Sequence, residues 1–221
     1  MGILEVVTDR LNFLRTHKIV TDEENLILEY IASNSKNDID PRLKIKLIEI
    51  LKMLVKRSRK PFGMLIILGW KREWNSQYAA LLDETQNLFE EKRYDLKEMS
   101  VDKAVKVFSA LKTFDGAILI NKEGHIIASG IYLINLNPKK VLERLKLKGE
   151  DLSQAFGFKE KVHTRHITAI TASLILRGTT VYTVSEESQI IRMYENGTII
   201  YSTLKEEQKE LVQKIKENNK S

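Results

Sequence analysis

The stretch FGMLIILG, residues Phe62 to Gly69, marks a change of pattern in this 221-residue sequence. It is an apolar run that follows Pro61 and ends in glycine, with no alternation of polar and apolar positions. Such a run is typical of a strand buried on both faces of a sheet. Because the residues before it follow helical patterns, we expect a domain boundary here.

Two helices are predicted before this strand. The segment TDEE, which begins at Thr21, resembles a capping box that opens the first helix. Asp40 followed by Pro41 indicates the start of the second helix, in which leucine and isoleucine recur at helical spacing until Pro61. We therefore expect residues 1–59 to form an all-helical region.

Helices and strands are mixed after Phe62. We expect a helix around residues 78–91 and a second one capped by Ser100. The segment GAILINKEGHIIASG, residues 116–130, is typical of a β-hairpin. Residues 179–202 contain three strand-like runs, and the turn residues Asn196 and Gly197 join the last two. These patterns predict an α/β fold with a mixed sheet flanked by helices.

The chain is expected to have three parts. An all-helical region covers residues 1–59, and the mixed α/β domain covers residues 60–203. Residues 204–221 are expected to form a charged helix with a thin apolar stripe, which packs loosely or frays.

Composition limits the possible functions. The chain contains no cysteine, which excludes disulfides and thiolate chemistry, so a metal would need imidazole nitrogen or the oxygen of a carboxylate, carbonyl or phosphate as ligands. Its apolar runs are too short to cross a bilayer, so we expect a cytoplasmic protein that does not associate with membranes. The formal net charge of +6 is modest. The densest basic cluster is KRSRK, residues 56–60, which could contact phosphates but fits a helix end better.

Three short motifs could carry chemistry. Asp115 and Gly116 lie between a predicted helix and a predicted strand, where a carboxylate can face a cleft. The segment TRH, residues 164–166, lies at a predicted helix start, which favours anions. SEES, residues 185–188, lies in a predicted turn between strands. Taken alone, each motif also fits a structural role, as a turn, a helix cap or a polar loop.

The order of these motifs adds information that the single motifs lack. The series FDGAILI, IYL, TRHITA and VSEES resembles the catalytic domain of the diadenylate cyclases, which condense two ATP molecules into cyclic di-AMP. The resemblance covers about Phe62 to Tyr201 and includes the apolar strand and the final hairpin.

The resemblance implies a role for each motif residue. Asp115 would be the catalytic carboxylate and a metal ligand, and Glu187 would be a second metal ligand for Mn²⁺ or Mg²⁺. The other implied residues would bind ATP: Gly116 and Ala117 near the ribose, Tyr132 and Leu133 near the adenine, and Thr164, Arg165, His166 and Ser185 near the phosphates. A tyrosine on a strand also suits a core position, so the role of Tyr132 is the least specific of these.

The family mechanism also implies an assembly. One site binds one ATP, and each ATP must attack the α-phosphate of another, so two protomers must face each other. We expect a homodimer, or a higher oligomer that contains such dimers, with ATP as substrate and cyclic di-AMP as product.

Three positions depart from the family pattern. His163 replaces a glycine, and Ile167 replaces an arginine that would bind phosphate. Phe114 stands where one branch of the family has a metal-binding histidine. His163 could compensate for that loss or could simply be solvated, and we favour solvation.

Two other functions stay open. A non-catalytic adenine-nucleotide sensor with the same fold would explain Phe114 and Ile167. A basic nucleic-acid-binding protein would explain the KRSRK cluster and the pI of about 9.3, but the sequence lacks a motif that reads nucleic acid.

Overall fold

The structure is a computed structural model that describes residues 21–34, 37–81, 94–149 and 151–218. The predicted helical content of residues 1–20, and most of the helix predicted at 78–91, lie outside the described residues. In the described part, Asn75–Tyr78 is a short helix and Ala79–Leu81 is a strand, so the prediction that a helix begins near residue 78 is wrong.

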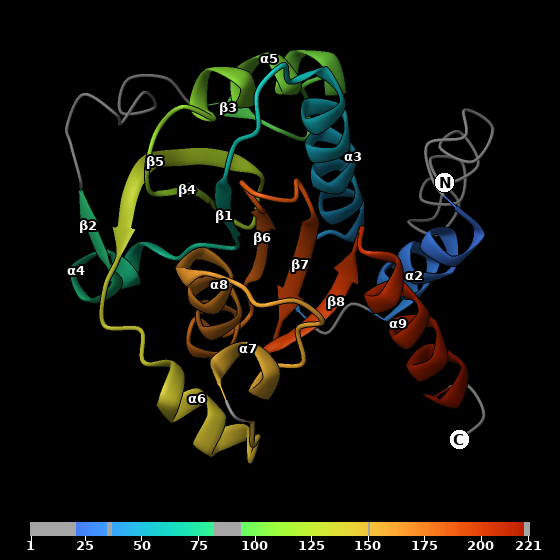
Figure 1. Cartoon of the computed structure of the whole chain (residues 1–221). Coiled ribbons are helices and arrows are strands. Elements are labelled where there is room, and N and C mark those ends of the chain that lie inside the picture. The colour runs from blue at the N-terminus through green and yellow to red at the C-terminus, as the bar shows by residue number, and fades with distance from the viewer. Residues whose placement is uncertain (1–20, 35–36, 82–93, 150, 219–221) are drawn as a thin grey trace.

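One mixed sheet organises the chain, in the order β2-β5-β4-β1-β6-β7-β8, with β3 also paired to β5 (Figure 1). β1 and β4 are parallel, and every other neighbouring pair is antiparallel. The strands are β1 (Met64–Leu68), β2 (Ala79–Leu81), β3 (Tyr94–Asp95), β4 (Ala117–Ile120), β5 (His125–Leu133), β6 (Thr180–Val184), β7 (Ile191–Glu195) and β8 (Thr198–Ser202). The predicted hairpins correspond to β4–β5 and β7–β8.

β1 lies in the middle of the sheet and is buried on both faces. Ile66 and Leu68 join the core on one face, while Leu65 and Ile67 join the core on the other. A strand with apolar side chains on both faces needs a cover on each side, which explains the uninterrupted run FGMLIILG.

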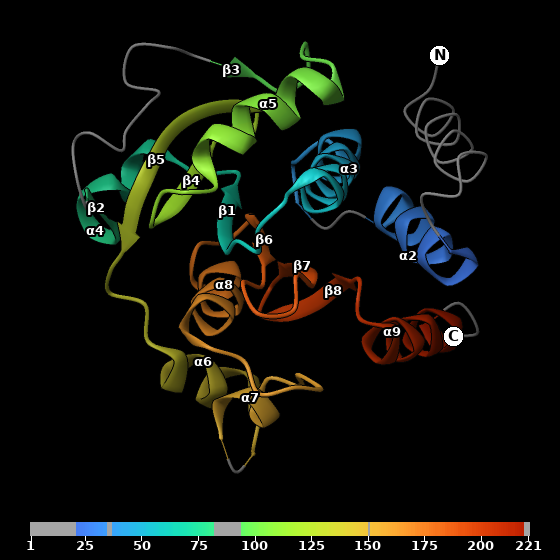
Figure 2. The ribbon, with the colours of Figure 1, turned by 45° about the horizontal axis from the view of Figure 1, so that its top comes forward.

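Helices supply those covers. α3 and α5 pack on one face of the sheet, and α8 packs on the other (Figures 1 and 2). The helices are α2 (Asp22–Ser33), α3 (Pro41–Arg57), the 3₁₀ turn η1 (Arg72–Trp74), α4 (Asn75–Tyr78), α5 (Val101–Leu111), α6 (Pro138–Leu145), α7 (Leu152–Ala155), α8 (Thr164–Ile175) and α9 (Lys205–Asn218). The mixed sheet flanked by helices confirms the predicted fold class.

The predicted helix starts are confirmed by their caps. The side chains of Thr21, Asp40 and Ser100 each accept a hydrogen bond from a backbone N–H in the first turn of α2, α3 and α5. These bonds satisfy donors that the helix itself leaves unpaired, so local sequence is enough to define these boundaries.

Buried ion pairs connect the early helices to the sheet. Lys44 of α3 lies 2.6 Å from Glu195 of β7, and Glu24 of α2 contacts both Lys52 of α3 and the Tyr201 hydroxyl of β8. Helices and sheet share one hydrophobic cluster. We therefore propose that the boundary near residue 60 marks the start of the sheet and does not separate two cores.

The last helix is anchored more firmly than its thin apolar stripe predicted. Arg192 of β7 donates two hydrogen bonds, of 2.7 and 3.0 Å, to Glu207 of α9, and both side chains are almost fully buried. Ile215 is also buried in the core. The prediction of loose packing is wrong for residues 205–218.

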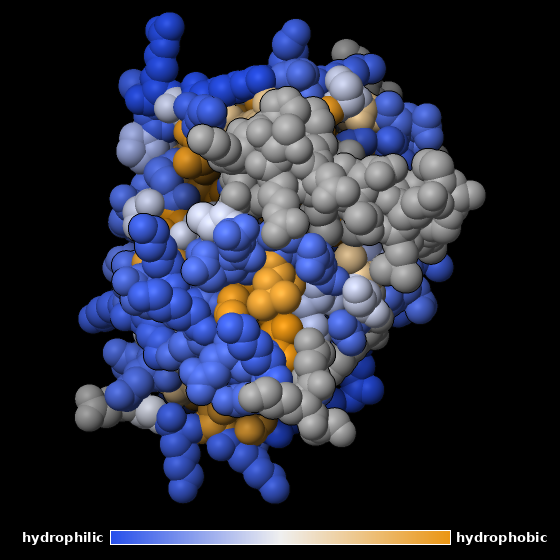
Figure 3. All heavy atoms as spheres, turned by 90° about the vertical axis from the view of Figure 1, so that its right-hand side faces the viewer, coloured by the Kyte–Doolittle hydropathy of each residue, from blue (hydrophilic) through white to orange (hydrophobic). Residues whose placement is uncertain are grey.

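Where its residues are described, the surface on the side of α2 and α9 is mostly hydrophilic, with a hydrophobic area near its centre and further hydrophobic atoms above and below it (Figure 3). Among the described residues, no helix is both long and apolar enough to cross a membrane.

Candidate functional site

A cavity of about 550 Å³ lies at the amino ends of β1 and β4. Because these two strands are parallel neighbours, the residues that begin them meet at one edge of the sheet. β5 runs antiparallel to β4 and brings its last residues to the same edge, where α8 also begins. The sequence-predicted residues that line this cavity are Asp115, Gly116, Ala117, Tyr132, Leu133, Thr164 and Arg165.

The segment before β4 needs a glycine for steric reasons. Gly116 has φ of +90°, and a Cβ atom there would lie 2.7 Å from the Gly130 carbonyl carbon of β5. Only glycine adopts this conformation readily and fits this close approach. The neighbouring Asp115 is exposed, and its carboxylate makes no hydrogen bond or ion pair with another described residue. It is therefore available to a ligand.

Tyr132 lies at the edge of the cavity, near the end of β5, where it pairs with Ala80 of β2. It is 57% exposed, so it does not occupy the core position that a strand tyrosine often has. An exposed aromatic ring beside a cavity can stack on a planar ligand such as a nucleobase. Leu133 follows it and pairs with Ala79.

Arg165 enters the cavity from the first turn of α8. Its guanidinium lies against the Gly63 backbone, because a Cβ on Gly63 would fall 1.9 Å from Arg165 Nη1. One carboxylate, that of Glu186, is 3.8 Å away. Thr164 is the first helical residue and His163 is the N-cap, without a side-chain capping bond.

A second cavity, of about 680 Å³, adjoins the first and shares Asp115 and Arg165 with it. Its lining is strongly basic, with the further cations Arg57, Arg59, Lys60 and Lys112. Arg57 pairs with Asp102 at 2.7 Å, and Lys112 donates to Ser58 at 3.0 Å. Among the described residues, the Arg59 and Lys60 side chains have no such partner, so they can bind an anion.

His166 is not part of either cavity. It is 4% exposed, and its Nδ1 lies 2.8 Å from the Tyr194 hydroxyl and 2.9 Å from the Thr183 hydroxyl. Burial first, and then the cations Arg192 and Arg165, lower the pKa of His166 to about 3. The His166 side chain is therefore neutral near pH 7. It is buried beneath the start of α8 and does not line the cavity as Thr164 and Arg165 do.

Ser185 and Glu187 lie in the turn after β6, outside the lining of both cavities. The Ser185 hydroxyl donates to Glu187 at 3.0 Å, and Glu187 is largely exposed. A hydrogen bond from its own backbone N–H, and then the one from Ser185, lower the pKa of Glu187. Its carboxylate is therefore ionised near neutral pH.

Within residues 21–34, 37–81, 94–149 and 151–218, no group of three or more His, Asp or Glu side chains could hold a metal. The Asp115 carboxylate alone still suits Mg²⁺ or Mn²⁺. Ions of this kind are commonly bound through one or two carboxylates together with substrate phosphates and water.

The three departures from the family pattern have different surroundings. Ile167 is 8% exposed and packs in the core beneath α8, so this position cannot offer a cation to the cavity. Phe114 is half-buried and lines the basic cavity. His163 is largely exposed and 4.0 Å from Glu187, which agrees with a solvated side chain.

The sequence interpretation missed the basic cavity. The KRSRK cluster is indeed a helix end, since α3 ends at Arg57. However, Arg57, Arg59 and Lys60 also line the cavity beside Asp115, because the link from α3 to β1 crosses that edge of the sheet. The sequence signal for this cavity is the basic cluster itself, which lies directly before β1, the strand that begins at the site.

These observations define an open cleft of about 550 Å³ at the amino ends of β1 and β4. The family model described as DisA bacterial checkpoint controller nucleotide-binding matches residues 52–199. This match covers more than half of the sequence, so the chain belongs to this family, which supports a nucleotide-binding function of the diadenylate cyclase type. No curated protein matches the sequence.

Two solved structures are similar to this chain. A hypothetical membrane spanning protein from Bacillus cereus has a TM-score of 0.50 at 16% identity, over 90% of this chain and 89% of that one. A double mutant of DacA from Staphylococcus aureus has a TM-score of 0.43 at 17% identity, over 78% of this chain and 94% of that one. At such low identity, the first likeness shows the fold alone.

Proposed function

We propose that this chain is a diadenylate cyclase that condenses two ATP molecules into cyclic di-AMP and two pyrophosphates. The observation that carries the proposal is the meeting of three groups at one cavity. The Asp115 carboxylate, which has no partner among the described residues, the exposed Tyr132 ring and the Arg165 guanidinium come from three separate segments of the chain. They match the base, the nucleobase platform and the phosphate ligand that the reaction needs.

The adenine and ribose would occupy the first cavity. Its volume of about 550 Å³ is within the range of about 300–1,000 Å³ common for small-molecule sites. The Tyr132 ring would stack on the adenine, with the backbone of Leu133 at its edge. Gly116 and Ala117 would allow the ribose to approach the start of β4, beside the Asp115 carboxylate.

The triphosphate would extend from Thr164 and Arg165 into the basic cavity. Arg59 and Lys60 have no partner among the described residues and would neutralise the leaving pyrophosphate. They would replace the cation that Ile167 does not supply. Ser185 and Glu187 adjoin this region through Glu186, and His166 would act from below by supporting the first turn of α8.

In each chemical step, the 3′-oxygen of one ATP attacks the α-phosphorus of the other. The bond between the α-phosphorus and the bridging oxygen breaks, and pyrophosphate leaves. The proton of the 3′-hydroxyl passes to the Asp115 carboxylate. A divalent cation held by Asp115, with Glu187 as a further ligand, would offset the negative charge of the phosphates.

Two copies of the chain must face each other for this reaction, because the two ATP molecules attack each other. Each cavity would supply one nucleotide, and both steps would occur across the contact between copies. The exposed position of Tyr132 and Asp115, at an open edge of the sheet, agrees with such an arrangement.

The first test is product formation by the parent and by Asp115→Asn. The purified protein is incubated with ATP and either Mn²⁺ or Mg²⁺, and the products are separated by chromatography. We expect cyclic di-AMP from the parent and a loss of at least about a hundredfold in the variant, the usual size of a general-base contribution. The matched control is Glu98→Gln, an exposed carboxylate outside both cavities, which is expected to keep full activity.

A nucleotide sensor is the second candidate. It is favoured by Ile167, which is a core residue here, and by the burial of His166 away from the cavities. A sensor would bind ATP, and Arg165→Gln would weaken that binding, but no cyclic di-AMP would form with either metal.

A further inference from the structure

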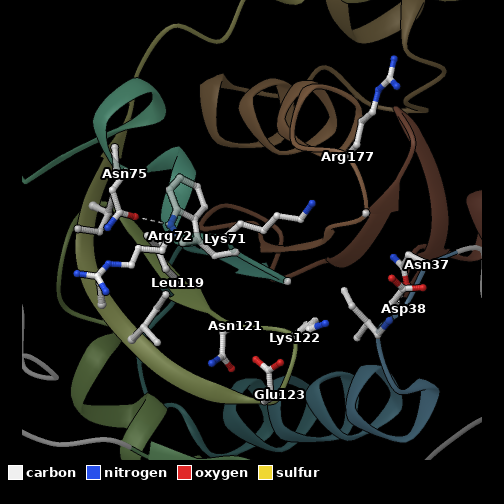
Figure 4. Close-up of a pocket in the computed structure, with 18 of the residues that line it drawn as sticks. Asn37, Asp38, Lys71, Arg72, Asn75, Leu119, Asn121, Lys122, Glu123 and Arg177 are labelled. Atoms are coloured by element: carbon white, nitrogen blue, oxygen red, sulfur yellow. Dashed lines mark hydrogen bonds between the residues drawn. The ribbon is translucent and has the colours of Figure 1, made fainter.

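The sheet carries a further cavity at the carboxyl ends of β1 and β4, away from the proposed ATP site. It has a volume of about 1180 Å³, and the links that follow these two parallel strands line it. Figure 4 shows Arg72 and Arg177 on different sides of this cavity, with Arg177 turned away from Lys122. These three cations therefore do not form one anion site. At the amino ends of the same strands, by contrast, the side chain of Gln189 joins two segments by direct hydrogen bonds.

The amide of Gln189 holds the turn between β6 and β7. Its Nε2 atom lies 2.8 Å from the Ser185 carbonyl oxygen and 3.1 Å from the Glu186 carbonyl oxygen, both in this turn. It also lies 3.0 Å from the carbonyl oxygen of Phe62, which is 127 residues away in the sequence. All three oxygens are acceptors, so they define the orientation in which the NH₂ group of the amide faces them. One side chain therefore fastens the turn to the link that enters β1.

This bond to Phe62 lies past the end of the strand pairing. The pairing of β1 with β6 ends at Met64 and Val184, so the Phe62 carbonyl has no partner in that ladder. Phe62 is 5% exposed, and a backbone carbonyl at such a position needs a donor. The Gln189 side chain supplies this donor in place of a further strand residue.

The backbone of Gln189 is also unusual. Its φ is +55°, in the left-handed region that glutamine seldom adopts. Such a conformation persists only where the surrounding structure favours it, and it is found most often at functional sites. Here the backbone N–H of Gln189 donates to the Ser185 carbonyl at 3.0 Å, while its side chain reaches Phe62. The backbone and the side chain of Gln189 together close the turn and attach it to β1.

The two segments that Gln189 joins both flank the Arg165 guanidinium. Phe62 precedes Gly63, whose backbone lies against the guanidinium. The carboxylate of Glu186 is 3.8 Å from Arg165 Nη2. The basic cavity is lined by Phe62, Gly63, Arg165 and Glu186, but not by Gln189. Gln189 can therefore affect a ligand in that cavity only through these neighbours.

We propose that Gln189 is a positioning residue of the ATP site, an inference that rests on the proposed function. Its amide fixes the two segments that flank Arg165, so the guanidinium is confined before a triphosphate binds. A confined arginine loses less conformational freedom on binding than a free one, and this preorganisation increases affinity. The triphosphate then replaces the weak contact of Arg165 with Glu186.

The test measures the affinity of the full chain for α,β-methylene-ATP by calorimetry. This analogue cannot release pyrophosphate, so binding is measured without turnover. Gln189→Met keeps a side chain of similar length without a donor, and Gln189→Gly removes the donor while adopting a positive φ without strain. We expect both variants to weaken binding about fivefold or more. The matched control is Gln213→Met, which removes an exposed bond to Glu217 on α9 and should keep the affinity of the parent.

A second comparison separates positioning from a purely structural role. If Gln189 acts through Arg165, Gln189→Met should weaken binding by less than about twofold when Arg165→Gln is already present, because the effects of coupled residues are not additive. A turn that only stabilises the fold would give the same fold-change with and without Arg165→Gln.

The possible results distinguish this inference from the proposed activity. The inference is overturned if either Gln189 variant binds the analogue as tightly as the parent, or if Gln189→Met has the same effect in both backgrounds. A parent that binds the analogue but forms no cyclic di-AMP from ATP overturns the cyclase activity alone. A parent that does not bind the analogue overturns both.

Discussion

At the residue scale, the shape of the site depends on two glycines, because they have no side chain. Gly63 leaves room for the Arg165 guanidinium, and Gly116 lets β4 approach β5 beside Asp115. The sequence placed Gly116 at the junction of a helix and a strand, near the ribose of a bound nucleotide, but it did not indicate the close approach to Gly130 of β5. It could not predict the role of Gly63, because the contact with Arg165 joins segments that are about a hundred residues apart in the sequence.

His166 gives a prediction about stability. Its pKa is about 3 in the folded chain and about 6.5 when unfolded, so the unfolded chain binds the extra proton between these pH values. The free energy of unfolding should therefore fall as pH falls from 6.5 to 3, by about 1.4 kcal/mol per pH unit from this group.

Urea unfolding at several pH values measures this effect. His166→Asn keeps a polar group near Tyr194 and Thr183 but removes the titration, so its stability should depend less steeply on pH than that of the parent. His163→Gln, at an exposed histidine nearby, should keep the parent's slope. Equal slopes for the parent and His166→Asn would contradict the assigned burial.

At the element scale, the link between α3 and β1 is the part of the site that sequence patterns did not assign. Basic residues such as KRSRK are expected both at the end of a helix and in a phosphate-binding site. Local sequence cannot distinguish these two roles. The distinction depends on the sheet topology, which brings this link next to the start of β4. By contrast, caps and apolar runs gave β1, α2, α3 and α5 directly, because those signals are local.

Arg59→Gln combined with Lys60→Gln tests this link. If both cations bind the triphosphate, the KM for ATP should rise about fivefold or more and become less sensitive to salt, since an exposed ion pair contributes up to about 1 kcal/mol. Steady-state kinetics at two salt concentrations measures this change. The adjacent cations Lys139 and Lys140 on α6 provide the matched double variant, and an equal rise in KM there would assign the effect to net charge.

At the scale of the whole molecule, one sheet carries cavities at both ends of β1 and β4, with two adjoining cavities at the amino ends and a further one at the carboxyl ends. The sequence indicated the cavity at the amino ends, because motifs known from a family occur there. It did not indicate the cavity at the carboxyl ends, whose cations are scattered along the chain between Lys71 and Arg177. The mixed sheet and its flanking helices followed from apolar patterns, but which loops share an edge depends on strand order.

The need for two facing copies predicts how the rate depends on concentration. If single chains are inactive, cyclic di-AMP formation per chain should rise with protein concentration and level off when dimers are complete. Sedimentation over the same range should give the same midpoint. A rate per chain that stays constant while the protein is monomeric would contradict the arrangement across two copies.

The most direct test of the central claim is the stoichiometry of the reaction with ATP. Cyclic di-AMP and pyrophosphate are measured together, in time courses for the parent and for Asp115→Asn. The proposed reaction predicts one cyclic di-AMP for every two pyrophosphates from the parent, and neither product above background from the variant. ATP that binds but yields no cyclic di-AMP with either Mn²⁺ or Mg²⁺, or a variant as active as the parent, would contradict it.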